Sequence, residues 1–383
     1  MIDFDLTAEQ FRERYAEREP YLKRQALPGA PFTWAELDAA LLRIEPTAPF
    51  FQLFNGGPIA EERFTEVVSE LGAPRRQLSK RRFYAELKAG ATLVVNGFER
   101  YSPAALRLCA EVRRFRGAAT AGNAYLSIGG RGTFGRHWDT HDVFAMQLIG
   151  RKRWQVFAAT FPLPLGMHRP ETVVAACPPE PILDCVLEEG DMLYVPRGWW
   201  HHVLPTEGPS LHLSIGTYAP SVHDFVSWAC ARHLPSALAA RRSLGAAASV
   251  EDLDAAIEAL RAVVLSAPAL AEFERDAAGR ERSHMELHTE LHLAAGADGL
   301  EPDDVISMNV AYRLQTAAGE IAVRGGRLRL RPLARTIVAA LGDDALSLDA
   351  LRNKLAGEDA VEIRNAVLDL AEHDVLMIVR AAR

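Results

Sequence analysis

Two stretches decide the fold: Gly135-Arg-His-Trp-Asp-Thr-His-Asp-Val-Phe144 and Glu188-Glu-Gly-Asp-Met-Leu-Tyr-Val-Pro-Arg-Gly-Trp-Trp-His-His202. The first offers His137 and Asp139, and the second offers His201. Residues two apart on a β-strand project from the same face, so the imidazole and the carboxylate of the first stretch are expected to point together. A histidine from a partner strand would complete a set of two imidazoles and one carboxylate. That set suits non-haem Fe(II) and leaves coordination positions open for substrate and oxygen.

The turn residues of the second stretch predict how His201 reaches the other two side chains. Gly190-Asp191 predicts a turn before an apolar strand, and Pro196-Arg-Gly198 ends that strand. A glycine there lets the chain bend, so that an imidazole three residues later can point back into a barrel. We therefore expect His137, Asp139 and His201 to converge from segments that are far apart in the sequence.

Neighbouring side chains have simpler interpretations. His141 is expected at the rim of the site, and His202 is expected to point away from His201 on a regular strand. His212 is expected in the barrel wall, within hydrogen-bonding reach of the site. The tryptophans of the two stretches are interpreted as packing residues: Trp138, Trp199 and Trp200.

Length and composition limit the class of protein. With 383 residues and 49% hydrophobic residues, the chain can bury a large core, and two or three domains are expected. The net charge of −7 argues against a strongly basic nucleic-acid binder. No apolar run reaches membrane-spanning length and the N-terminus does not resemble a signal peptide, so we expect a soluble cytoplasmic protein without a membrane partner. The four cysteines show no CxxC spacing and are expected to be free thiols.

Short strand-like segments follow one another between Asn123 and Tyr218. Glycines and prolines separate them, a pattern typical of an all-β sandwich or barrel. Closed barrels bind ligands in their mouths, which agrees with ligand residues that point inward from strands. The expected strands are Asn123–Ile128, His137–Leu148, Arg153–Phe157, Cys185–Glu188, Asp191–Val195 and Leu211–Gly216.

The segment before this barrel is of mixed type. A capping-box pattern at Thr7 predicts a helix through about Arg18, and the stretch from Thr33 to Leu42, with Glu36 in its first turn, predicts a second, amphipathic helix. Phe50–Phe54 and Ala91–Asn96 predict short strands. The basic segment from Arg75 to Arg82 is either a solvated loop or helix face, or a surface that steers an acidic partner.

Two regions of different amino-acid composition follow the barrel. Residues 222–295 are rich in Ala, Leu, Glu and Arg, which predicts a helical bundle that serves either as a dimerisation module or as a monomeric prop. Beyond residue 300, a strand (Arg327–Arg331), three helices (Pro332–Leu341, Leu348–Leu355 and Ala360–His373) and a closing strand (Val375–Val379) resemble a winged helix. The third helix carries Glu362, Asp369 and Glu372, which would repel phosphate, so no nucleic-acid partner is expected.

A buried cation would narrow the chemistry of the metal site. An iron oxygenase that uses 2-oxoglutarate must also hold the far carboxylate of that co-substrate. Gly150-Arg-Lys-Arg-Trp154 supplies Lys152, which lies fifteen positions after His137 (152 − 137 = 15). In an extended segment, Arg151 and Arg153 would face away from Lys152. The alternative is a basic triplet that is solvated in a hairpin.

The span from Asn123 to Tyr218 resembles the JmjC-type, cupin-fold oxygenases of the ribosomal-oxygenase group. That group includes bacterial ribosomal-protein arginine hydroxylases and nucleolar histidine hydroxylases. The order of the regions beyond the barrel is similar as well. The matching motifs are Asn123-x-Tyr125, His137-Trp-Asp139, Asp142-Val-Phe144, Gln147-Leu-Ile-Gly-Arg-Lys-Arg-Trp154, Gly190-Asp-x-Leu-Tyr-x-Pro-Arg-Gly198 and Leu211-His-Leu-Ser214.

The resemblance implies an α+β fold, with a double-stranded β-helix (cupin/jelly-roll, JmjC) barrel, a helical dimerisation bundle and a winged-helix-like C-terminal domain. The expected boundaries are 1–220 for the catalytic domain with its N-terminal extension, 221–298 for the dimerisation domain and 299–383 for the C-terminal domain. The implied Fe(II) ligands are His137, Asp139 and His201. Lys152 takes the place of the residue that binds the far carboxylate of 2-oxoglutarate, and a lysine there is more similar to the nucleolar branch. The co-substrate pocket is expected to include Asn123, Tyr125 and Ser214.

The implied activity is that of an Fe(II)- and 2-oxoglutarate-dependent dioxygenase. With O2 it would hydroxylate an arginine or histidine side chain of a protein, for which a ribosomal protein is the candidate, and it would act as a homodimer. One alternative is the same chemistry on a natural-product peptide or a small molecule. Another is a non-catalytic cupin scaffold or a winged-helix regulator.

Overall fold

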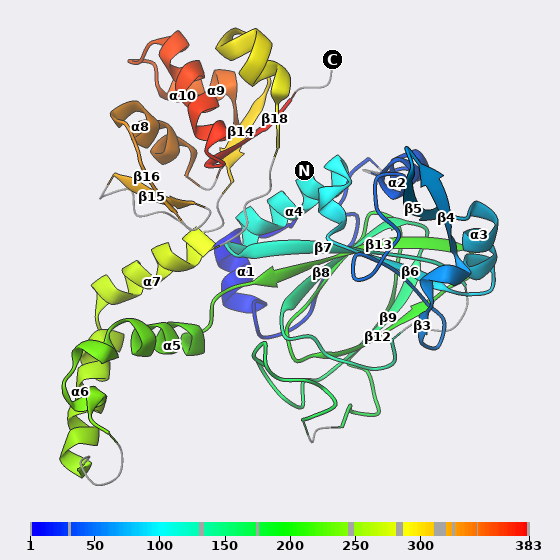
Figure 1. Cartoon of the computed structure of the whole chain (residues 1–383), viewed down its shortest axis with the longest axis horizontal. Coiled ribbons are helices and arrows are strands. Elements are labelled where there is room, and N and C mark those ends of the chain that lie inside the picture. Colours follow the sequence, from blue (N-terminus) through cyan, green and yellow to red (C-terminus); the bar gives the residue numbers. More distant parts are fainter. Residues whose placement is uncertain are drawn as a thin grey trace. The chain divides into compact units, whose positions relative to one another are not determined.

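The chain divides into two compact units in the computed structural model (Figure 1). One comprises residues 1–116 and 120–218, and the other comprises residues 117–119 and 219–383. The structure describes residues 2–29, 32–129, 134–173, 176–243, 249–280, 286–309, 319–323, 326–342 and 344–380. The glycine-rich segment at residues 130–133 lies outside the described residues.

The first unit is built around an eight-stranded sheet. In spatial order its strands are β1 (Tyr21–Lys23), β11 (Met192–Val195), β8 (Asp142–Ile149), β13 (Pro209–Tyr218), β7 (Ala119–Ile128), β6 (Thr92–Asn96), β2 (Phe51–Phe54) and β3 (Pro58–Ile59). Strand β8 pairs antiparallel with both β11 and β13, and β6 pairs antiparallel with both β7 and β2. The sheet therefore brings together strands from the N-terminal segment and from the predicted barrel.

A smaller sheet completes the barrel. It has β9 (Lys152–Phe157) in the middle, with β10 (Leu183–Leu187) on one side and β12 (Trp200–Pro205) on the other. Strand β8 illustrates why the barrel holds together, because all eight of its residues are buried. Phe144 and Met146 pack into the main hydrophobic core, whereas Val143 and Ala145 pack with residues of β9 and β11. Alternation with a period of two therefore buries both faces of β8.

One predicted strand was wrong in its extent. The sequence predicted a strand from His137 to Leu148, whereas β8 begins only at Asp142. His137 instead makes an isolated antiparallel bridge with His201. Asp139 lies in irregular chain between that bridge and β8. The two ligand candidates thus come from an extended loop and not from one regular strand.

The first unit also contains four helices, of which α4 packs against the central strand β13: α1 (Ala8–Arg14), α2 (Trp34–Leu41), α3 (Lys80–Lys88) and α4 (Pro103–Arg116). The predicted capping box at Thr7 is confirmed, and Thr33 forms one as well, since each threonine and the residue three positions later bond to each other's backbone N–H. Helix α1 ends at Arg14 and not at Arg18, because the chain turns there and Glu17 adopts a left-handed conformation with φ of 59°.

The basic segment forms part of a hairpin of β4 (Thr65–Glu70) and β5 (Ala73–Leu78), followed by the start of α3. Its arginines are paired with nearby carboxylates: Arg75 with Glu70, Arg76 with Glu61 and Glu62, and Arg82 with Glu66. Exposed pairs of this kind stabilise little. The pairing favours the interpretation of a solvated surface.

The second unit begins with helices α5 (Val222–Arg232), α6 (Val250–Val264) and α7 (Ala267–Arg280). Phe225, Trp228 and Phe273 form the buried contact between α5 and α7. The remainder has a sheet of β17 (Ala345–Ser347), β14 (Val305–Met308) and β18 (Leu376–Val379), a hairpin of β15 (Glu320–Val323) and β16 (Gly326–Arg329), and helices α8 (Pro332–Leu341), α9 (Leu348–Lys354) and α10 (Ala360–Glu372).

The predicted helices of the C-terminal region agree with α8, α9 and α10, and Ser347 caps α9 as expected. Strands β14, β15 and β17 were not predicted. The assignment of this region as a winged helix, and a boundary at residue 298, stay predictions. None of the described helices is long and apolar enough to cross a membrane. All four cysteines are free, although only Cys109 is buried.

Candidate metal and co-substrate site

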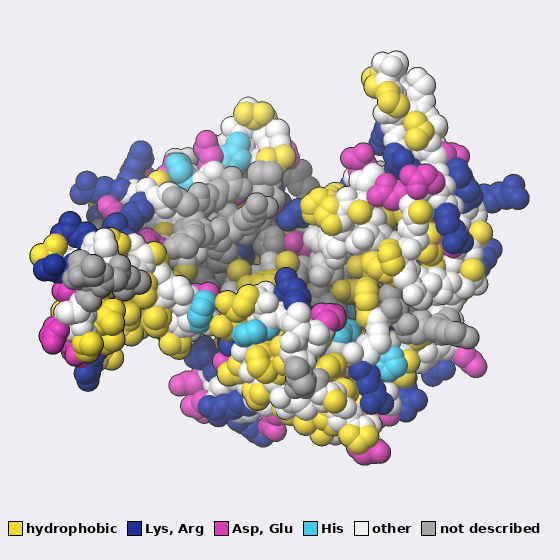
Figure 2. Space-filling model, turned by 60° about the horizontal axis from the view of Figure 1, so that its bottom comes forward, with side chains coloured by type: hydrophobic (Ala, Val, Ile, Leu, Met, Phe, Trp, Pro, Cys, Tyr) yellow, Lys and Arg dark blue, Asp and Glu magenta, His cyan; other side chains and the backbone are white. Residues whose placement is uncertain are grey.

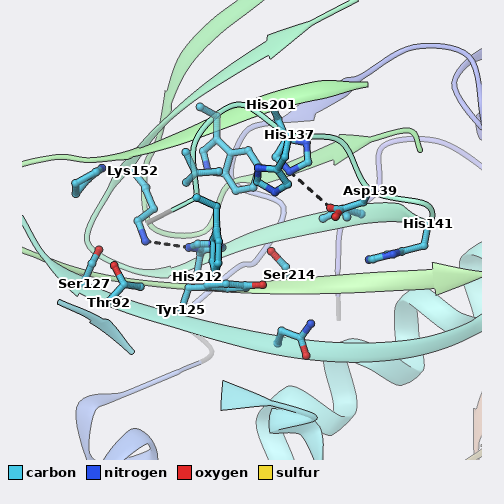
Figure 3. A pocket seen from close by; sticks show the side chains of 16 residues that line it. Thr92, Tyr125, Ser127, His137, Asp139, His141, Lys152, His201, His212 and Ser214 are labelled. Atoms are coloured by element: carbon cyan, nitrogen blue, oxygen red, sulfur yellow. Dashed lines mark hydrogen bonds and ion pairs between the residues drawn. The ribbon is translucent and has the colours of Figure 1, made fainter. Parts of the chain in front are cut away.

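A cavity of about 200 Å³ lies between the two sheets of the first unit (Figure 3). Strands β6, β7, β8 and β13 line it from the larger sheet, and β9 and β12 line it from the smaller one. The loop before β8 completes the wall. The lining residues are Thr92, Asn123, Tyr125, Ser127, Phe134, His137, Asp139, His141, Val143, Lys152, Trp154, His201, Val203, Pro205, His212 and Ser214.

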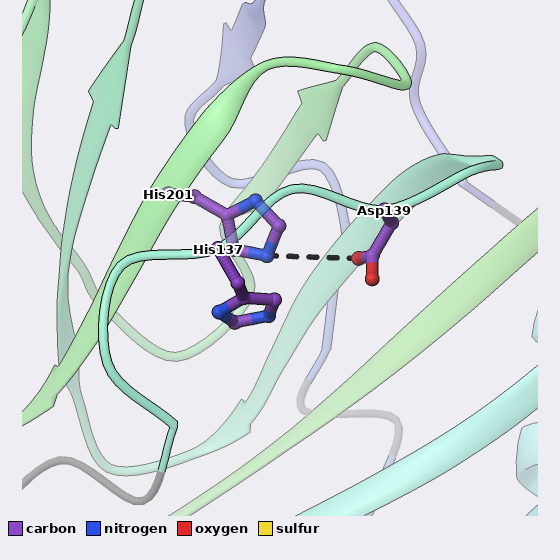
Figure 4. A group of neighbouring side chains, drawn as sticks. All are labelled: His137, Asp139 and His201. Atoms are coloured by element: carbon purple, nitrogen blue, oxygen red, sulfur yellow. Dashed lines mark ion pairs between the residues drawn. The ribbon is translucent and has the colours of Figure 1, made fainter. Parts of the chain in front are cut away.

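The three predicted ligands meet in this cavity (Figure 4). One donor atom from each of His137, Asp139 and His201 lies within 4.8 Å of the others. His201 Nε2 is 3.6 Å from Asp139 Oδ2, and the two imidazole rings are 4.3 Å apart between centroids. Among the described residues, this is the one cluster of three or more such side chains that could hold a metal ion. Two nitrogen donors and one oxygen donor form the set that suits non-haem Fe(II).

Hydrogen bonds to backbone carbonyls orient both imidazoles. His137 Nδ1 lies 3.0 Å from the carbonyl oxygen of Gly135, and His201 Nδ1 lies 3.2 Å from that of Trp199. A carbonyl can only accept, so each Nδ1 carries the proton and donates it. The proton-free Nε2 atoms are then available for a metal, which is the usual arrangement of metal-binding histidines.

The backbone holds the two ligand segments in register. His201 N–H donates to His137 O at 2.8 Å, and His137 N–H donates back to His201 O at 3.2 Å. Gly198 N–H donates to Asp139 O at 2.9 Å. The Arg197 N–H donates to the buried carboxylate of Asp142 at 3.0 Å. These bonds tie the loop before β8 to the loop before β12, so the ligands are positioned before any metal arrives.

Gly198 is the residue in this arrangement that tolerates substitution least. Its φ is +82°, and a Cβ would lie 2.6 Å from Phe161 O and 2.8 Å from Pro164 Cδ. Gly198→Ala is expected to lower the free energy of unfolding by about 2–4 kcal/mol and to weaken metal affinity, since the bond to Asp139 O would shift. Chemical denaturation and metal titration measure the two effects.

Gly208→Ala is a matched control, because Gly208 has φ of +83° but no neighbouring atom lies within 4 Å of the position that a Cβ would take. It should show only the backbone penalty of roughly 1 kcal/mol and normal metal affinity. Equal effects of the two substitutions would show that the contacts around Gly198 are unimportant.

The charges of the triad are set by burial and by one another. Burial, together with the neighbouring His137, lowers the pKa of His201 to about 4, so its imidazole is neutral at pH 7. Burial alone would raise the pKa of Asp139, but His201, His141 and His137 outweigh it and hold that pKa below its ordinary value. A neutral imidazole and an ionised carboxylate are the forms that bind metal.

Lys152 lies at the other side of the cavity from Asp139 and His141 (Figure 3). It is buried, and its Nζ is 3.2 Å from His212 Nδ1. Burial lowers the pKa of Lys152 to about 7 and holds the pKa of His212 well below its ordinary value. The neutral His212 accepts the bond from Lys152. As expected, Arg151 and Arg153 are exposed.

Two hydroxyl groups accompany Lys152. Thr92 on β6 is paired in register with Ser127 on β7, and in Figure 3 both side chains lie beside the Lys152 ammonium. The Ser127 hydroxyl is buried, and none of the residues that the structure describes forms a hydrogen bond with it. A buried hydroxyl without a partner is destabilising, so an oxygen-rich ligand beside Lys152 would satisfy it.

Aromatic rings line the side of the cavity along the stretch from the triad to Lys152. Tyr125 stacks on His212, with centroids 4.8 Å apart and an interplanar angle of 5°. Trp154 packs against both His201 and His212. These contacts fix His212 and shield the cavity from solvent.

The cavity contains all seven residues that the sequence singled out: His137, Asp139, His201, Lys152, Asn123, Tyr125 and Ser214. His141 also lines it and stacks on Tyr218. His202 does not line it, while Trp138 and Trp200 are packing residues. Thr92, Ser127 and Trp154 were not predicted. Ser127 continues the every-second-residue pattern of Asn123 and Tyr125, so strand periodicity could have found it.

Comparisons with known proteins show which family and fold the chain resembles. Residues 94–225 match the JmjC domain family. The chain is 30% identical over 138 residues to the bifunctional lysine-specific demethylase and histidyl-hydroxylase NO66 of Drosophila persimilis. The aligned region covers 35% of this chain and 20% of that protein. It is 28% identical over 237 residues to ribosomal oxygenase 1 of Gallus gallus, and this aligned region covers 60% of this chain and 37% of that protein. The chain thus spans well under half the length of these relatives.

Solved structures show the same fold over the whole chain. The Escherichia coli ribosomal oxygenase YcfD covers 99% of both chains with a TM-score of 0.62 and 19% identity. A structure of YcfD in complex with cobalt and 2-oxoglutarate has the same TM-score at 18% identity. The resemblance to JmjC-type oxygenases of the ribosomal-oxygenase group is therefore confirmed, and the first unit has the JmjC cupin-like fold.

Proposed function

We propose that the protein is an Fe(II)- and 2-oxoglutarate-dependent dioxygenase that hydroxylates an amino-acid side chain of another protein. The observation that carries the proposal is a single cavity with the His137, Asp139 and His201 donors at one place and the buried Lys152 at another. Metal donors alone are compatible with many reactions. A buried lysine in the same cavity indicates that the bound co-substrate carries a carboxylate with which the lysine can pair.

The donor set fits a resident Fe(II). Both imidazoles present Nε2, and the Asp139 carboxylate is ionised. Three protein ligands leave coordination positions for a bidentate co-substrate and for oxygen. Among the described lining residues, Asp139 is the one carboxylate, so the cavity does not supply a further acidic ligand.

The opposite end fits the far carboxylate of 2-oxoglutarate. A buried lysine is strongly stabilised by an opposing carboxylate. The Ser127 hydroxyl offers a further hydrogen bond. When bound, Fe(II) and 2-oxoglutarate supply the oxidative chemistry, in which O2 converts 2-oxoglutarate to succinate and CO2 and adds one oxygen atom to a C–H bond of the substrate.

The protein residues have three tasks in this reaction. Lys152, fixed by His212, orients the co-substrate so that its keto-acid end faces the triad. The Tyr125 and Trp154 rings exclude water from the region between the two ends. The backbone bonds between the two ligand loops keep the donors at fixed positions throughout turnover.

The lining of the cavity favours a neutral target side chain. A guanidinium is bound best by a carboxylate that can accept two hydrogen bonds. Asp139, the one acidic side chain among the described lining residues, is assigned to the metal. Asn123, Ser214 and His141 offer uncharged hydrogen-bonding groups instead. Of the two candidate targets, histidine therefore fits better than arginine.

Turnover of the co-substrate tests the proposal. Purified protein with Fe(II), 2-oxoglutarate and oxygen should form succinate slowly without a protein substrate and faster when one is supplied. Absence of both succinate formation and 2-oxoglutarate binding would refute the proposed activity. If a small-molecule extract stimulated succinate formation as much as a protein substrate does, the small-molecule alternative would be favoured.

We also propose that helix α6 mediates homodimerisation. Val250, Leu253 and Ile257 lie on one stripe of this helix, and each is more than half exposed. Figure 2 shows hydrophobic side chains gathered at the left edge, where Figure 1 draws α6. An exposed apolar stripe of this kind marks an interaction surface, and a second copy would bury it symmetrically.

Leu253→Glu combined with Ile257→Glu is expected to convert a dimer to a monomer, because two carboxylates from each copy, four in all, would be buried together in the contact. Sedimentation velocity measures the change. Val361→Glu is the control, since Val361 is an exposed apolar residue on another helix, α10. A monomeric wild-type protein, or a dimer that survives the double substitution, would contradict the assignment.

A further inference from the structure

The segment from β16 to the start of α8 presents a row of arginines. Arg327, Arg329 and Arg331 are exposed, whereas Leu328 is partly buried and Leu330 is buried, so arginine and leucine alternate along the chain. Leucines of this segment pack into the core of the C-terminal region. Arg327 and Arg329 lie on β16, and Arg331 follows it in a still extended conformation at the start of α8, with φ of −67° and ψ of 160°. Because side chains of an extended chain alternate between faces, the three guanidinium groups are expected on one face, with about 7 Å between successive residues of the row. We call these three residues the arginine face.

The arginine face belongs to a segment of opposite charge to the protein. Residues 310–335 contain six arginines, no lysine and one acidic residue, Glu320, for a net charge of +5 (6 − 1). The whole chain has a net charge of −7. Charge segregation of this degree points to an anionic partner.

The charges of this face are mostly unpaired. Arg327 lies 3.6 Å from Asp276 of α7. Arg329 is opposite Glu320 in the hairpin register, but no ion pair joins them. Among the described residues, Arg329 and Arg331 have no ion-pair partner. This differs from the β4–β5 hairpin, in which the basic side chains are matched by glutamates.

The chemistry of the face favours nucleic acid over an acidic protein. Between residues 294 and 360, the described part of the chain exposes no large hydrophobic side chain. Protein interfaces depend on buried apolar and aromatic anchors at their centre, whereas binding to nucleic acid is driven mainly by neutralisation of phosphates. Arginine binds phosphate with two parallel hydrogen bonds and can stack on bases, which lysine cannot do.

We propose that the arginine face binds the backbone of single-stranded RNA. The face is a narrow row the length of a few phosphates, which suits one strand better than a duplex. The guanidinium N–H groups that a phosphate does not use can donate to the ribose 2′-hydroxyl. The acidic residues that argued against phosphate binding are on α10, a different element of the C-terminal region. This binding does not depend on the oxygenase activity.

Fluorescence anisotropy with labelled oligouridine tests the inference on the full-length protein. Arg329→Ser combined with Arg331→Ser should weaken binding roughly 10- to 50-fold at low salt. It should also lower the slope of log affinity against log salt concentration by about 1.4 in magnitude, since each phosphate contact to a single strand contributes about 0.7. Arg352→Ser combined with Lys354→Ser also removes two positive charges from the C-terminal region and should have little effect. Arg329→Lys combined with Arg331→Lys should retain the salt dependence with weaker binding.

Three outcomes would overturn the inference. These are no salt-dependent binding by the wild type, equal loss in the two double serine variants, and tighter binding to polyglutamate than to oligouridine. Equal affinity for oligothymidine would remove the assignment to RNA. Arg329, Arg331 and Lys354 are exposed and Arg352 is half-buried. Unchanged thermal unfolding of the Arg329 and Arg331 variants is therefore expected and shows that any loss of binding is local.

Discussion

His137→Ala is expected to abolish stable Fe(II) binding and, with it, the formation of succinate. Loss of an outer partner of a metal ligand typically weakens affinity or activity by 10- to 100-fold, and loss of a direct donor should exceed about 100-fold. His137 supplies one of three donors, and its Nε2 has no substitute at that position among the described residues. Titration with Co(II) or anaerobic Fe(II) measures the metal affinity directly.

His202→Ala is the matched control for this prediction. It removes an imidazole from the residue next to His201, yet His202 does not line the cavity. This variant should bind metal normally. If His137→Ala retained wild-type metal affinity, or if His202→Ala lost as much, the assigned donor set would be wrong.

Lys152→Met is expected to eliminate 2-oxoglutarate binding while it makes the protein without co-substrate more stable. Burial lowers the pKa of Lys152 from 10.5 to about 7, so the charged form destabilises the fold by a few kcal/mol at lower pH. Methionine has similar length without that penalty, although it removes the bond to His212. Thermal unfolding should shift upward by several degrees, and calorimetry should detect no co-substrate binding. A variant that bound 2-oxoglutarate as the wild type does would contradict the role of Lys152.

The same lysine predicts how binding depends on pH. Its folded-state pKa is lowered, so the destabilisation is fully present below pH 7 and disappears as the pH rises from about 7 toward 10.5. A bound carboxylate favours the charged lysine, so binding takes up a proton above pH 7. The affinity for 2-oxoglutarate should be constant below pH 7 and fall up to about tenfold per pH unit above it. Lys152→Arg, which stays charged, should show no such decline, and a decline in both proteins would assign it to another group.

The sequence singled out side chains that the structure brings into one cavity, but its prediction of the local structure around them was less accurate. The residue types and turn residues around His137, Asp139 and His201 pointed to a metal-binding set. Lys152 could not be distinguished from a solvated basic triplet until the resemblance to JmjC-type oxygenases was considered. The placement of His137 and Asp139 on one strand was nevertheless wrong, since β8 begins at Asp142. Their convergence depends on the bridge to His201 and on the bond from Gly198. Such long-range backbone contacts leave no periodic signal in the sequence.

Other features depended on contacts between segments that are distant in the chain. Thr92 faces the cavity because β6 pairs with β7, and a lone threonine gives no sign of that register. The pairing of Arg75, Arg76 and Arg82 with glutamates could not be distinguished from an unpaired basic surface until the hairpin geometry was known. Local signals were more reliable, as the capping box at Thr7 and the helix predicted from Thr33 illustrate.

Mass spectrometry of a treated cell lysate tests the central claim most directly. The lysate would be incubated with Fe(II), 2-oxoglutarate and either the wild-type protein or the Lys152→Met variant. We expect a peptide that gains one oxygen atom on a single side chain, a histidine by preference, with the wild type only. Consumption of 2-oxoglutarate by the wild type without any modified peptide, or the same modified peptide with the variant, would contradict the proposed protein hydroxylase activity.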